Sequence, residues 1–393
     1  TADEIRYKVT GVNTVEVMAI ENMFLESIEV PATVTNPDDS KTYNVTGIGN
    51  SAFVQALMAT SITIPEGVTY IGTDAFRDCK IIDFVIPSTV KSIGDGAFKS
   101  CYNLTSVTIK GGNIGEQAFW GCNGLTSLSL QEGVTGIGSQ AFYYCYQLGG
   151  DLVIPSTVKS IGPNAFEQCS DLTSVTIKGG IIGDQAFSGC NGLSSISLQE
   201  GVTSIGANAF DYATYEEDYL IIPSTVKSIG EGAFNRISVS TVKVFAPVPP
   251  ELGNDAFWAT TFYVPDVEKY QECDGWQEYK YQIELLTEFK LGDQMCLLDE
   301  TGNYFEQDLT FNDKDLYVSG RDFTVNGSIT YKRTFTNKNW QALYVPFAME
   351  YDDWEYHFDV AAINNFHEYT DDEGQTVKTE LEIRMVKSGT LKP

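Results

Sequence analysis

Apolar residues recur along most of this chain in units of 21 to 24 residues, each with a short alternating segment, a turn and an Ala-Phe pair. In the unit LTSVTIKGGNIGEQAFWGC, Val107 and Ile109 alternate with Thr108 in the period-two pattern of a β-strand. Leu104 and Phe119 of the same unit are also apolar, so we expect these four apolar side chains to point inward. The pattern therefore predicts one short strand and one return segment in every unit.

The Ala-Phe pair marks ten successive units. Its phenylalanines are Phe53, Phe76, Phe98, Phe119, Phe142, Phe166, Phe187, Phe210, Phe234 and Phe257. Units this short must stack as coils of a solenoid, with their strands in a parallel sheet about 4.8 Å apart. The return segment has room for only a turn of helical or 3₁₀ structure. An Ile-Gly step precedes most Ala-Phe pairs, and we expect its glycine to form a turn with positive φ.

A longer repeat lies over the short one. The sequence IPSTVKSIG begins at Ile86, Ile154 and Ile222, so its copies are 68 residues apart, a distance of three units. Residues 86–153 and 154–221 share about 45 identical positions. We interpret this as the duplication of a three-unit block, so identical surface residues in the two blocks do not by themselves indicate a binding site.

The ends of the repeat array need caps, because a solenoid leaves an apolar surface at each end. Residues 1–47 are predicted to form a β-hairpin cap and a first irregular repeat, and the repeats then run over 48–265. Residues 266–288 are predicted to form a C-terminal cap with a helix that starts near Pro265. Residues 289–393 hold strand-like segments between Gly, Asn and Asp clusters, which predicts an all-β, sandwich-like domain, incomplete where the chain ends.

The charge of the chain excludes some classes of partner. With 53 acidic and 25 basic residues the net charge is −28, which argues against nucleic acid and anionic membrane surfaces. The sequence holds no apolar run of 18 residues, so we expect no membrane-spanning segment. The chain begins at Thr1 without the apolar region of a signal peptide, as a trimmed, exported product would.

Six cysteines stand three residues after a repeat phenylalanine. They are Cys79, Cys101, Cys122, Cys145, Cys169 and Cys190. Neighbouring coils could bring these thiols together, which raises a metal or disulfide hypothesis. Other units have Ala56, Ala213, Ile237 and Thr260 at the same position, so the sequence favours a buried packing ladder, with no metal or cofactor. Cys273 and Cys296 lie outside this ladder.

Residues that could carry catalysis are few. His357 and His367 are the two histidines, and neither stands in a recognisable nucleophile or metal-binding motif, so we do not expect an enzyme. Two acidic turns offer carboxylates for Ca²⁺: Asp38 and Asp39, and the group Asp371, Asp372 and Glu373. Neither turn has EF-hand spacing, so we expect solvated hairpin tips.

Aromatic residues gather beside the Ala-Phe turn in three consecutive units. They are Tyr102, Trp120, Tyr143, Tyr144 and Tyr146. Since stacked units place equivalent positions side by side, these rings could form one patch suited to protein contacts or to stacking on sugars. The alternative is that they shield the turns of the coils. The outward strand positions are mostly hydroxyl and β-branched residues, which offer a broad surface with few strong anchors.

Segments such as GVTYIGTDAFRDC and GVTSIGANAF resemble the BspA-like class of leucine-rich repeats found in Bacteroidetes surface proteins. The resemblance covers residues 48–265, and RTFTNKNWQALYVPF resembles a β module that follows such repeats. The resemblance of the repeats implies an α/β to mainly β solenoid, with a parallel sheet on one face and short helical or 3₁₀ turns on the other.

The same resemblance implies a non-enzymatic, secreted or cell-surface bacterial protein. Its partner would be an extracellular or host protein, bound through the solenoid in adhesion or protein–protein interaction, and we expect a monomer. The alternative is a glycan-binding surface protein that uses the aromatic patch. A third hypothesis, an enzyme in the C-terminal domain, would need a histidine to meet carboxylates in a cleft.

Overall fold

The protein is described by a computed structural model, which gives residues 4–38, 40–259 and 261–286 in full and, after these, the backbone of nine strands between 288 and 391. The chain divides into two compact units, Thr1–Val242 with Pro250–Thr260, and Lys243–Pro249 with Thr261–Pro393. We describe each unit by itself. The boundaries predicted from the sequence at 47, 265 and 288 stay a proposal.

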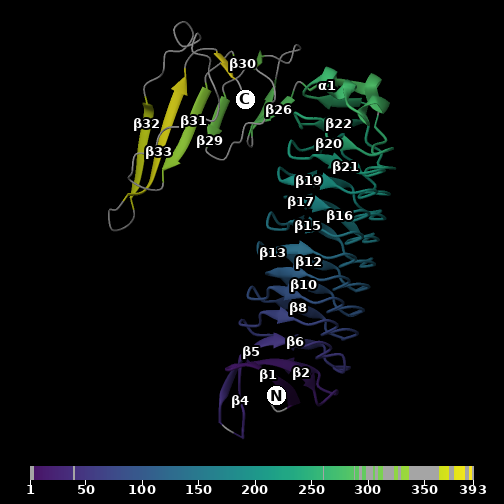
Figure 1. The fold of residues 1–393 in the computed structure, drawn as a ribbon, viewed down its shortest axis with the longest axis vertical. Helices are drawn as coiled ribbons and strands as arrows, with labels where there is room; N and C mark the ends of the chain where they lie inside the picture. Colours follow the sequence, from purple (N-terminus) through teal and green to yellow (C-terminus); the bar gives the residue numbers. More distant parts are fainter. Residues whose placement is uncertain are drawn as a thin grey trace. The chain divides into compact units, whose positions relative to one another are not determined.

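The first unit is a solenoid of stacked coils, which confirms the predicted fold class (Figure 1). Its longest sheet has 13 strands. These are β1 (Ile5–Gly11), β2 (Thr14–Ile20), β4 (Thr33–Thr35), β5 (Thr42–Ile48), β7 (Tyr70–Ile71), β9 (Ser92–Ile93), β11 (Gly112–Ile114), β13 (Val134–Ile137), β15 (Ser160–Ile161), β17 (Gly180–Ile182), β19 (Val202–Ile205), β21 (Ser228–Ile229) and β23 (Glu251–Leu252). β1 and β2 form an antiparallel pair, β4 pairs antiparallel with β5, and the strands from β5 onward are parallel.

The Ile-Gly step does not form the turn with positive φ that the sequence predicts. Its isoleucine ends a short strand of the long sheet, and the glycine is absent from the residues with positive φ. Glycine is needed here for space, because a Cβ on Gly115 would lie 2.6 Å from the Ile93 carbonyl oxygen of the preceding coil. The same backbone crowding recurs in every coil, at Gly49, Gly72, Gly94, Gly138, Gly162, Gly183, Gly206, Gly230 and Gly253.

The longer, alternating segments form a second set of parallel strands. These are β3 (Ser27–Glu29) with β6 (Ser61–Thr63); β8 (Asp83–Ile86), β10 (Ser106–Ile109) and β12 (Ser127–Leu130); β14 (Gly150–Ile154), β16 (Leu172–Ile177) and β18 (Ser195–Leu198); and β20 (Tyr219–Ile222) with β22 (Thr241–Val244). Their register aligns equivalent repeat positions, as in Val107 opposite Phe84 and Leu128. The inward and outward alternation predicted from the sequence is confirmed by their burial.

This second set is interrupted every three coils, at the boundaries of the duplicated block. Within a block, the residue after a strand donates its N–H to the preceding coil, as Gln131 does to the Ile109 carbonyl at 3.0 Å and Lys178 does to Ile154 at 3.2 Å. At the first strand of each block this position holds proline, Pro155 or Pro223, which has no N–H to donate. The proline of IPSTVKSIG thus accounts for one lost ladder bond at each break.

The core is a ladder of the ten repeat phenylalanines. Neighbouring rings are 4.8 to 5.3 Å apart between centroids, with interplanar angles of 2° to 8°. This spacing is close to the separation of hydrogen-bonded strands, so parallel coils and stacked rings satisfy the same geometry. Phe76 to Phe234 are each fully buried.

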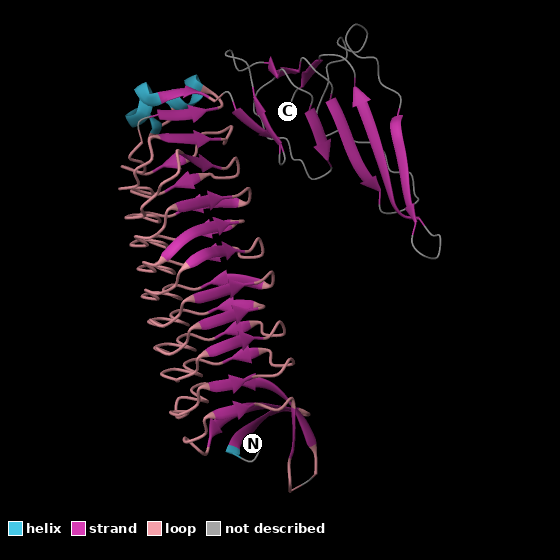
Figure 2. Cartoon of the chain, turned by 180° about the vertical axis from the view of Figure 1, so that it is seen from behind, coloured by secondary structure: helices cyan, strands magenta, loops and turns pink. Residues whose placement is uncertain are grey.

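The return segments are single hydrogen-bonded turns, and residues 50–259 as described hold no helix of either kind (Figure 2). Each turn is closed by a bond such as the one from the Cys122 N–H to the Phe119 carbonyl at 3.2 Å, and it is tied to the next coil by the Phe119 N–H and the Ala141 carbonyl at 2.7 Å. Most coils have two residues with positive φ. One lies two positions before the repeat phenylalanine and the other two positions after it, as Gln117 and Gly121 do around Phe119. Turns of this shape replace the short helical segments that we expected.

In the second unit, α1 (Val267–Glu272) and η2 (Trp276–Gln282) lie between β24 (Thr261–Val264) and β25 (Ile283–Leu285). Asp266 caps α1 by accepting the Lys269 N–H, which agrees with the helix start predicted at this point. Tyr270 and Trp276 are fully buried with their rings 4.9 Å apart, and the Tyr270 hydroxyl donates to the Ala246 carbonyl.

After residue 286 the described elements are all strands. They are β26 (Glu288–Leu291), β27 (Gln294–Leu297), β28 (Tyr304–Phe305), β29 (Leu309–Asn312), β30 (Phe323–Val325), β31 (Ile329–Phe335), β32 (Ile363–Thr370), β33 (Thr376–Met385) and β34 (Gly389–Leu391). The largest sheet here has the order β29-β31-β33-β32. A sandwich-like arrangement stays a prediction. His357, Asp39, Asp371, Asp372 and Glu373, and the side chains of His367 and Cys296, lie outside the described residues.

Candidate functional site

The aromatic side chains singled out from the sequence come from three consecutive coils. Relative to the repeat phenylalanine, Trp120 and Tyr143 occupy the first following position, Tyr144 the second, and Tyr102 and Tyr146 the fourth. Tyr102 is 57% and Tyr146 40% exposed, and the other three are half-buried. All five therefore lie on the side of the solenoid formed by the turns.

Tyr144 is the centre of this group. Its ring centroid lies 3.9 Å from that of Tyr143, 5.3 Å from Tyr146 and 6.0 Å from Trp120. The corresponding interplanar angles are 49°, 25° and 64°. Trp120, Tyr143, Tyr144 and Tyr146 form one cluster, which we call the aromatic cluster, and its rings meet at angles instead of forming a flat surface.

The backbone of Tyr144 is in the left-handed region, with φ of 62°. The same repeat position has positive φ in most coils, with glycine in two of them, Gly121 and Gly189, and other residues in the rest, such as Ser100 and Gln168. A bulky side chain with this φ costs about 1 to 2 kcal/mol relative to the right-handed region. The tyrosine is thus held in a strained backbone position that places its ring among the other three.

Charged and amide side chains border the aromatic cluster on two sides. The Lys99 ammonium lies 4.7 Å from the centroid of the Trp120 ring and donates to the Gln117 Oε1 atom at 2.7 Å. On the other side, the Tyr144 N–H bonds to the Glu167 carbonyl at 3.1 Å, and the Glu167 carboxylate accepts a hydrogen bond from the Asn164 amide. The cluster therefore stands between a cation and a carboxylate.

The pKa values of Tyr143 and Glu167 are both shifted by their surroundings in this group. The pKa of Tyr143 is raised, first by its hydrogen bond with Tyr144, then by burial and by the negative charge of Glu167. Burial raises the pKa of Glu167, and the hydrogen bond that its carboxylate accepts from Asn164 partly lowers it again. A carboxylate that has lost part of its hydration gains more from a nearby cation than an exposed one does.

A second arrangement of the same kind was not foreseen from the sequence. Tyr212 stands at the same repeat position as Tyr144, with φ of 67°, and the Arg236 guanidinium of the next coil lies 4.2 Å from its ring centroid. Arg236 also pairs with Asp211 at 3.7 Å. The missed signal was the repeat register, because Tyr212 and Arg236 both stand two residues after a repeat phenylalanine.

The repeats also decide the family of the chain. Residues 40–149 and 150–264, more than half of the 393, match the family described as the BspA type leucine rich repeat region, six copies. This protein belongs to the BspA-type leucine-rich repeat family. No curated protein sequence matches the chain.

Solved structures similar to this BspA-type chain include leucine-rich repeat proteins of bacteria. A leucine-rich repeat protein of T. pallidum is 23% identical over 53% of this chain and 86% of its own, with a TM-score of 0.37. One from Bacteroides ovatus is 21% identical over 72% and 97%, with a TM-score of 0.35. A leucine rich cell surface protein from Faecalibacterium prausnitzii is 21% identical over 65% and 93%, with a TM-score of 0.31.

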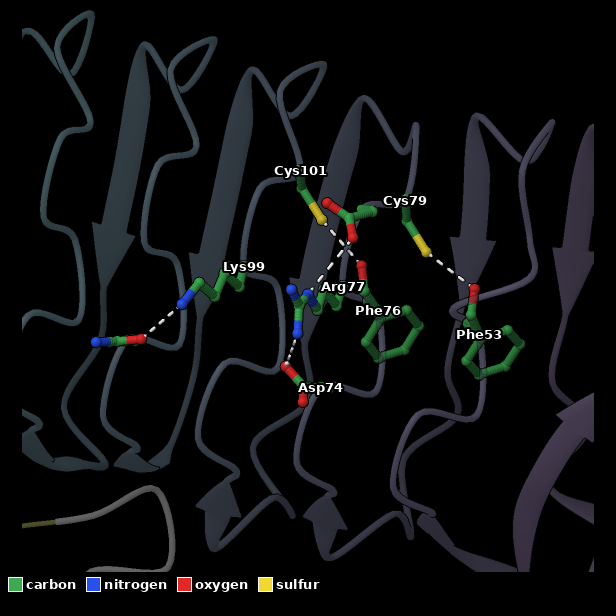
Figure 3. Close-up of polar contacts among 9 residues, drawn as sticks. Phe53, Asp74, Phe76, Arg77, Cys79, Lys99 and Cys101 are labelled. Carbon is green, nitrogen blue, oxygen red and sulfur yellow. Dashed lines mark hydrogen bonds and ion pairs between the residues drawn. The ribbon is translucent and has the colours of Figure 1, made fainter.

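The cysteines of the BspA-type coils are free and buried, and each thiol points at the backbone of the preceding coil (Figure 3). Cys79 donates to the Phe53 carbonyl at 3.2 Å and Cys101 to Phe76 at 3.0 Å, and the same bond recurs at Cys122, Cys145, Cys169 and Cys190. Burial raises the pKa of these thiols, to about 12 for Cys145 and Cys190. They form a packing ladder that also satisfies carbonyl groups.

The strand face of the BspA-type coils is polar and paired with itself. The Ser106 hydroxyl donates to Asp83 at 2.6 Å, and Ser174 donates to Asp151 at 2.6 Å. A groove of about 400 Å³ lies where β6 and β8 are not hydrogen-bonded, lined by residues such as Thr63, Val85 and Lys110. It lacks an aromatic anchor at its mouth comparable to those of the turn side.

Two further points concern metals and membranes. Among the fully described residues no group of three or more His, Cys, Asp or Glu side chains is placed to hold a metal ion, and of the first predicted acidic turn only Asp38 lies among them. In the same part of the chain, no helix has the length and apolar character needed to cross a bilayer.

Proposed function

We propose that this protein is a non-enzymatic binding protein that contacts a protein partner through the turn side of its solenoid, with the aromatic cluster as the anchor. The observation that carries the proposal is Tyr144, whose ring lies 3.9 to 6.0 Å between centroids from three other aromatic rings. Partly exposed tyrosine and tryptophan dominate the energetics of many protein interfaces.

The alternative surface, the strand face, is less suited to be the anchor. Its outward residues are mostly hydroxyl-bearing or β-branched, and Ser106 and Ser174 already bond to the carboxylates of Asp83 and Asp151 on the same face. Such a face can extend a contact over many coils but supplies few groups worth more than about 1 kcal/mol each.

The family supports a secreted or cell-surface location, with an extracellular or host protein as partner and adhesion as the outcome. A solenoid presents a long surface for its mass, which suits such a role.

A glycan partner is the second candidate, and it rests on the exposure of Tyr102 and Tyr146. Sugars stack well on a flat aromatic surface. The angle of 64° between Trp120 and Tyr144 and of 49° between Tyr143 and Tyr144 gives a cornered surface, which favours an irregular protein surface over the flat face of a sugar ring.

The test is a binding screen of the full chain against a panel of extracellular-matrix proteins and a glycan array, repeated with Trp120→Ala and Tyr144→Ala. Trp258 and Tyr212 occupy the same two repeat positions in other coils and are 72% and 52% exposed, so Trp258→Ala and Tyr212→Ala are matched controls. We expect binding of a protein to fall about tenfold or more in the cluster variants and to persist in the controls. Unchanged binding in both cluster variants would reject the aromatic cluster as the contact.

A further inference from the structure

The starting point is the pair of tyrosines that share one repeat position and one backbone conformation. Tyr144 has φ of 62° and Tyr212 has φ of 67°. In the coil after Tyr212, the residue at this position is Arg236, whose guanidinium lies 4.2 Å from the tyrosine ring centroid. In the coil after Tyr144 the same position holds Gln168. Tyr212 thus has a cation from the next coil beside it, whereas the equivalent residue in the coil after Tyr144 is a neutral amide.

A carboxylate accompanies the cation site in both places. Asp211 pairs with Arg236 at 3.7 Å, from the same coil as Tyr212. Beside the aromatic cluster the carboxylate belongs to Glu167 of the following coil, whose backbone carbonyl accepts the Tyr144 N–H at 3.1 Å. Both sites therefore combine aromatic rings with one carboxylate, which is the combination that holds a guanidinium.

The turn side uses cation–π contacts at the other end of the cluster as well. The Lys99 ammonium lies 4.7 Å from the Trp120 ring centroid, and both residues directly follow a repeat phenylalanine. In the coil after that of Tyr143, the residue directly after the repeat phenylalanine is Glu167. The sequence of turn residues thus changes from basic at Lys99, through aromatic at Trp120 and Tyr143, to acidic at Glu167.

The charges around the cluster and in the whole chain favour a basic partner. Asp171, an exposed residue, lies next to Tyr146, whose carbonyl accepts its N–H at 3.2 Å. The coil of Tyr212 continues into Glu216, Glu217 and Asp218. With a net charge of −28, the protein attracts positively charged segments at long range.

We propose that the aromatic cluster and Glu167 bind an arginine-bearing basic segment of the protein partner, with the partner's guanidinium taking the place beside Tyr144 that Arg236 takes beside Tyr212. This inference rests on the proposed function, because it names the chemistry of the partner at the same site. It is independent of which protein supplies the arginine.

The test uses the full chain labelled with 5-fluorotryptophan and titrated with a tetra-arginine peptide at about 150 mM salt, where long-range attraction to an acidic protein is largely screened. The ¹⁹F signal of Trp120, identified through Trp120→Phe in a separate sample, reports binding at the cluster, and the signal of Trp258 reports binding elsewhere. A tetra-citrulline peptide has the same shape without the charge. We expect a saturable shift of the Trp120 signal with arginine and none with citrulline.

The variants separate the site from non-specific attraction. Tyr144→Ala and Glu167→Gln should each weaken the tetra-arginine affinity at least about fivefold, while Tyr144→Phe, which keeps the ring, and the matched Tyr212→Ala should stay within about twofold. Absence of a saturable Trp120 shift, an equal shift with citrulline, or unchanged affinity in both cluster variants would each overturn the inference.

The outcome is distinguishable from failure of the proposed function. If a protein from the screen needs Trp120 but tetra-arginine neither binds nor competes with it, the inference fails and the protein-binding function stands. If tetra-arginine binds at Trp120 while protein binding is unaffected by Trp120→Ala, the cation site stands and the proposed anchor fails.

Discussion

At the scale of single residues, the structure assigns two different reasons for glycine in the coils. Gly115 has ordinary φ but no room, since a Cβ would lie 2.6 Å from the Ile93 carbonyl oxygen. Gly150 has the opposite situation, with φ of 75° and nothing within 4 Å of the added carbon. The first is a requirement of coil stacking and the second a requirement of backbone conformation.

We therefore expect Gly115→Ala to destabilise the protein more than Gly150→Ala. The first forces two coil backbones apart and should cost about 3 kcal/mol or more, and the second costs about 1 kcal/mol for a non-glycine residue in the left-handed region. Urea unfolding followed by circular dichroism measures both. Equal losses, or a larger loss for Gly150→Ala, would contradict the steric explanation.

At the scale of elements, the repeat unit could be predicted from the sequence, but the 13-stranded sheet could not. The alternation of apolar Val107 and Ile109 with polar neighbours predicts β10, because four residues are enough to show the period-two pattern of a strand. A strand such as β9 has two residues, Ser92–Ile93, and carries no period. Its place in the long sheet follows from stacking, as does the glycine after it.

The candidate site was predictable only in part for a similar reason. The repeat register brings Trp120, Tyr143 and Tyr144 to one side, and this could be derived from spacing alone. The angles between the rings depend on rotamers and on the left-handed backbone of Tyr144, which spacing does not determine. Glu167 was missed because it looks like an ordinary surface carboxylate until its coil is placed against Tyr143.

The cysteine ladder gives a prediction about pH at this scale. A thiol whose pKa is raised in the fold favours the protonated form there, so its stabilising effect is complete below its ordinary value of 9.0 and is lost as the pH rises towards the folded value, about 12 for Cys145. At pH 10 the unfolded chain gains about 1.4 kcal/mol per thiol. Urea unfolding under reducing conditions should therefore show a lower free energy of unfolding at pH 10 than at pH 7.

Cys145→Ala is the control, because alanine already occupies the same repeat position at Ala56 and Ala213. In this variant the free energy of unfolding should differ between pH 7 and pH 10 by about 1.4 kcal/mol less than in the unchanged protein, because one buried thiol has been removed. An unchanged difference would show that the Cys145 thiol does not prefer its protonated form in the fold.

At the scale of the whole repeat unit, each coil contacts its neighbours, so the solenoid should tolerate the loss of a complete block. Residues 86–153 and 154–221 begin at equivalent positions, and the stacked phenylalanines continue across their boundary with 5.0 Å between Phe142 and Phe166. Deleting residues 154–221 joins Val153 to Ile222 in the same register and should leave a folded, shorter solenoid, measured by far-ultraviolet circular dichroism and thermal unfolding.

This deletion also places the coil of Arg236 directly after that of Tyr144. The guanidinium should then lie over Tyr144 as it does over Tyr212, where the distance is 4.2 Å, and block the cluster from within. The deletion also removes Glu167, whose repeat position is then taken by Asn235. We expect tetra-arginine binding to weaken in the deletion variant and to be restored when Arg236→Gln and Asn235→Glu are added together. Full restoration by Asn235→Glu alone, with Arg236 still present, would show that Arg236 does not block the cluster.

The most direct measurement of the central claim is hydroxyl-radical footprinting of the full chain with and without the protein partner found in the screen. Tryptophan and tyrosine are oxidised when exposed, so the method reports the side chains in question themselves. The proposal predicts that binding protects Trp120 and Tyr146, while Trp258 and Tyr281, which are 72% and 96% exposed in the free protein, stay reactive. Protection at the strand face around Val85 and Val153, with Trp120 and Tyr146 still oxidised at the free rate, would contradict it.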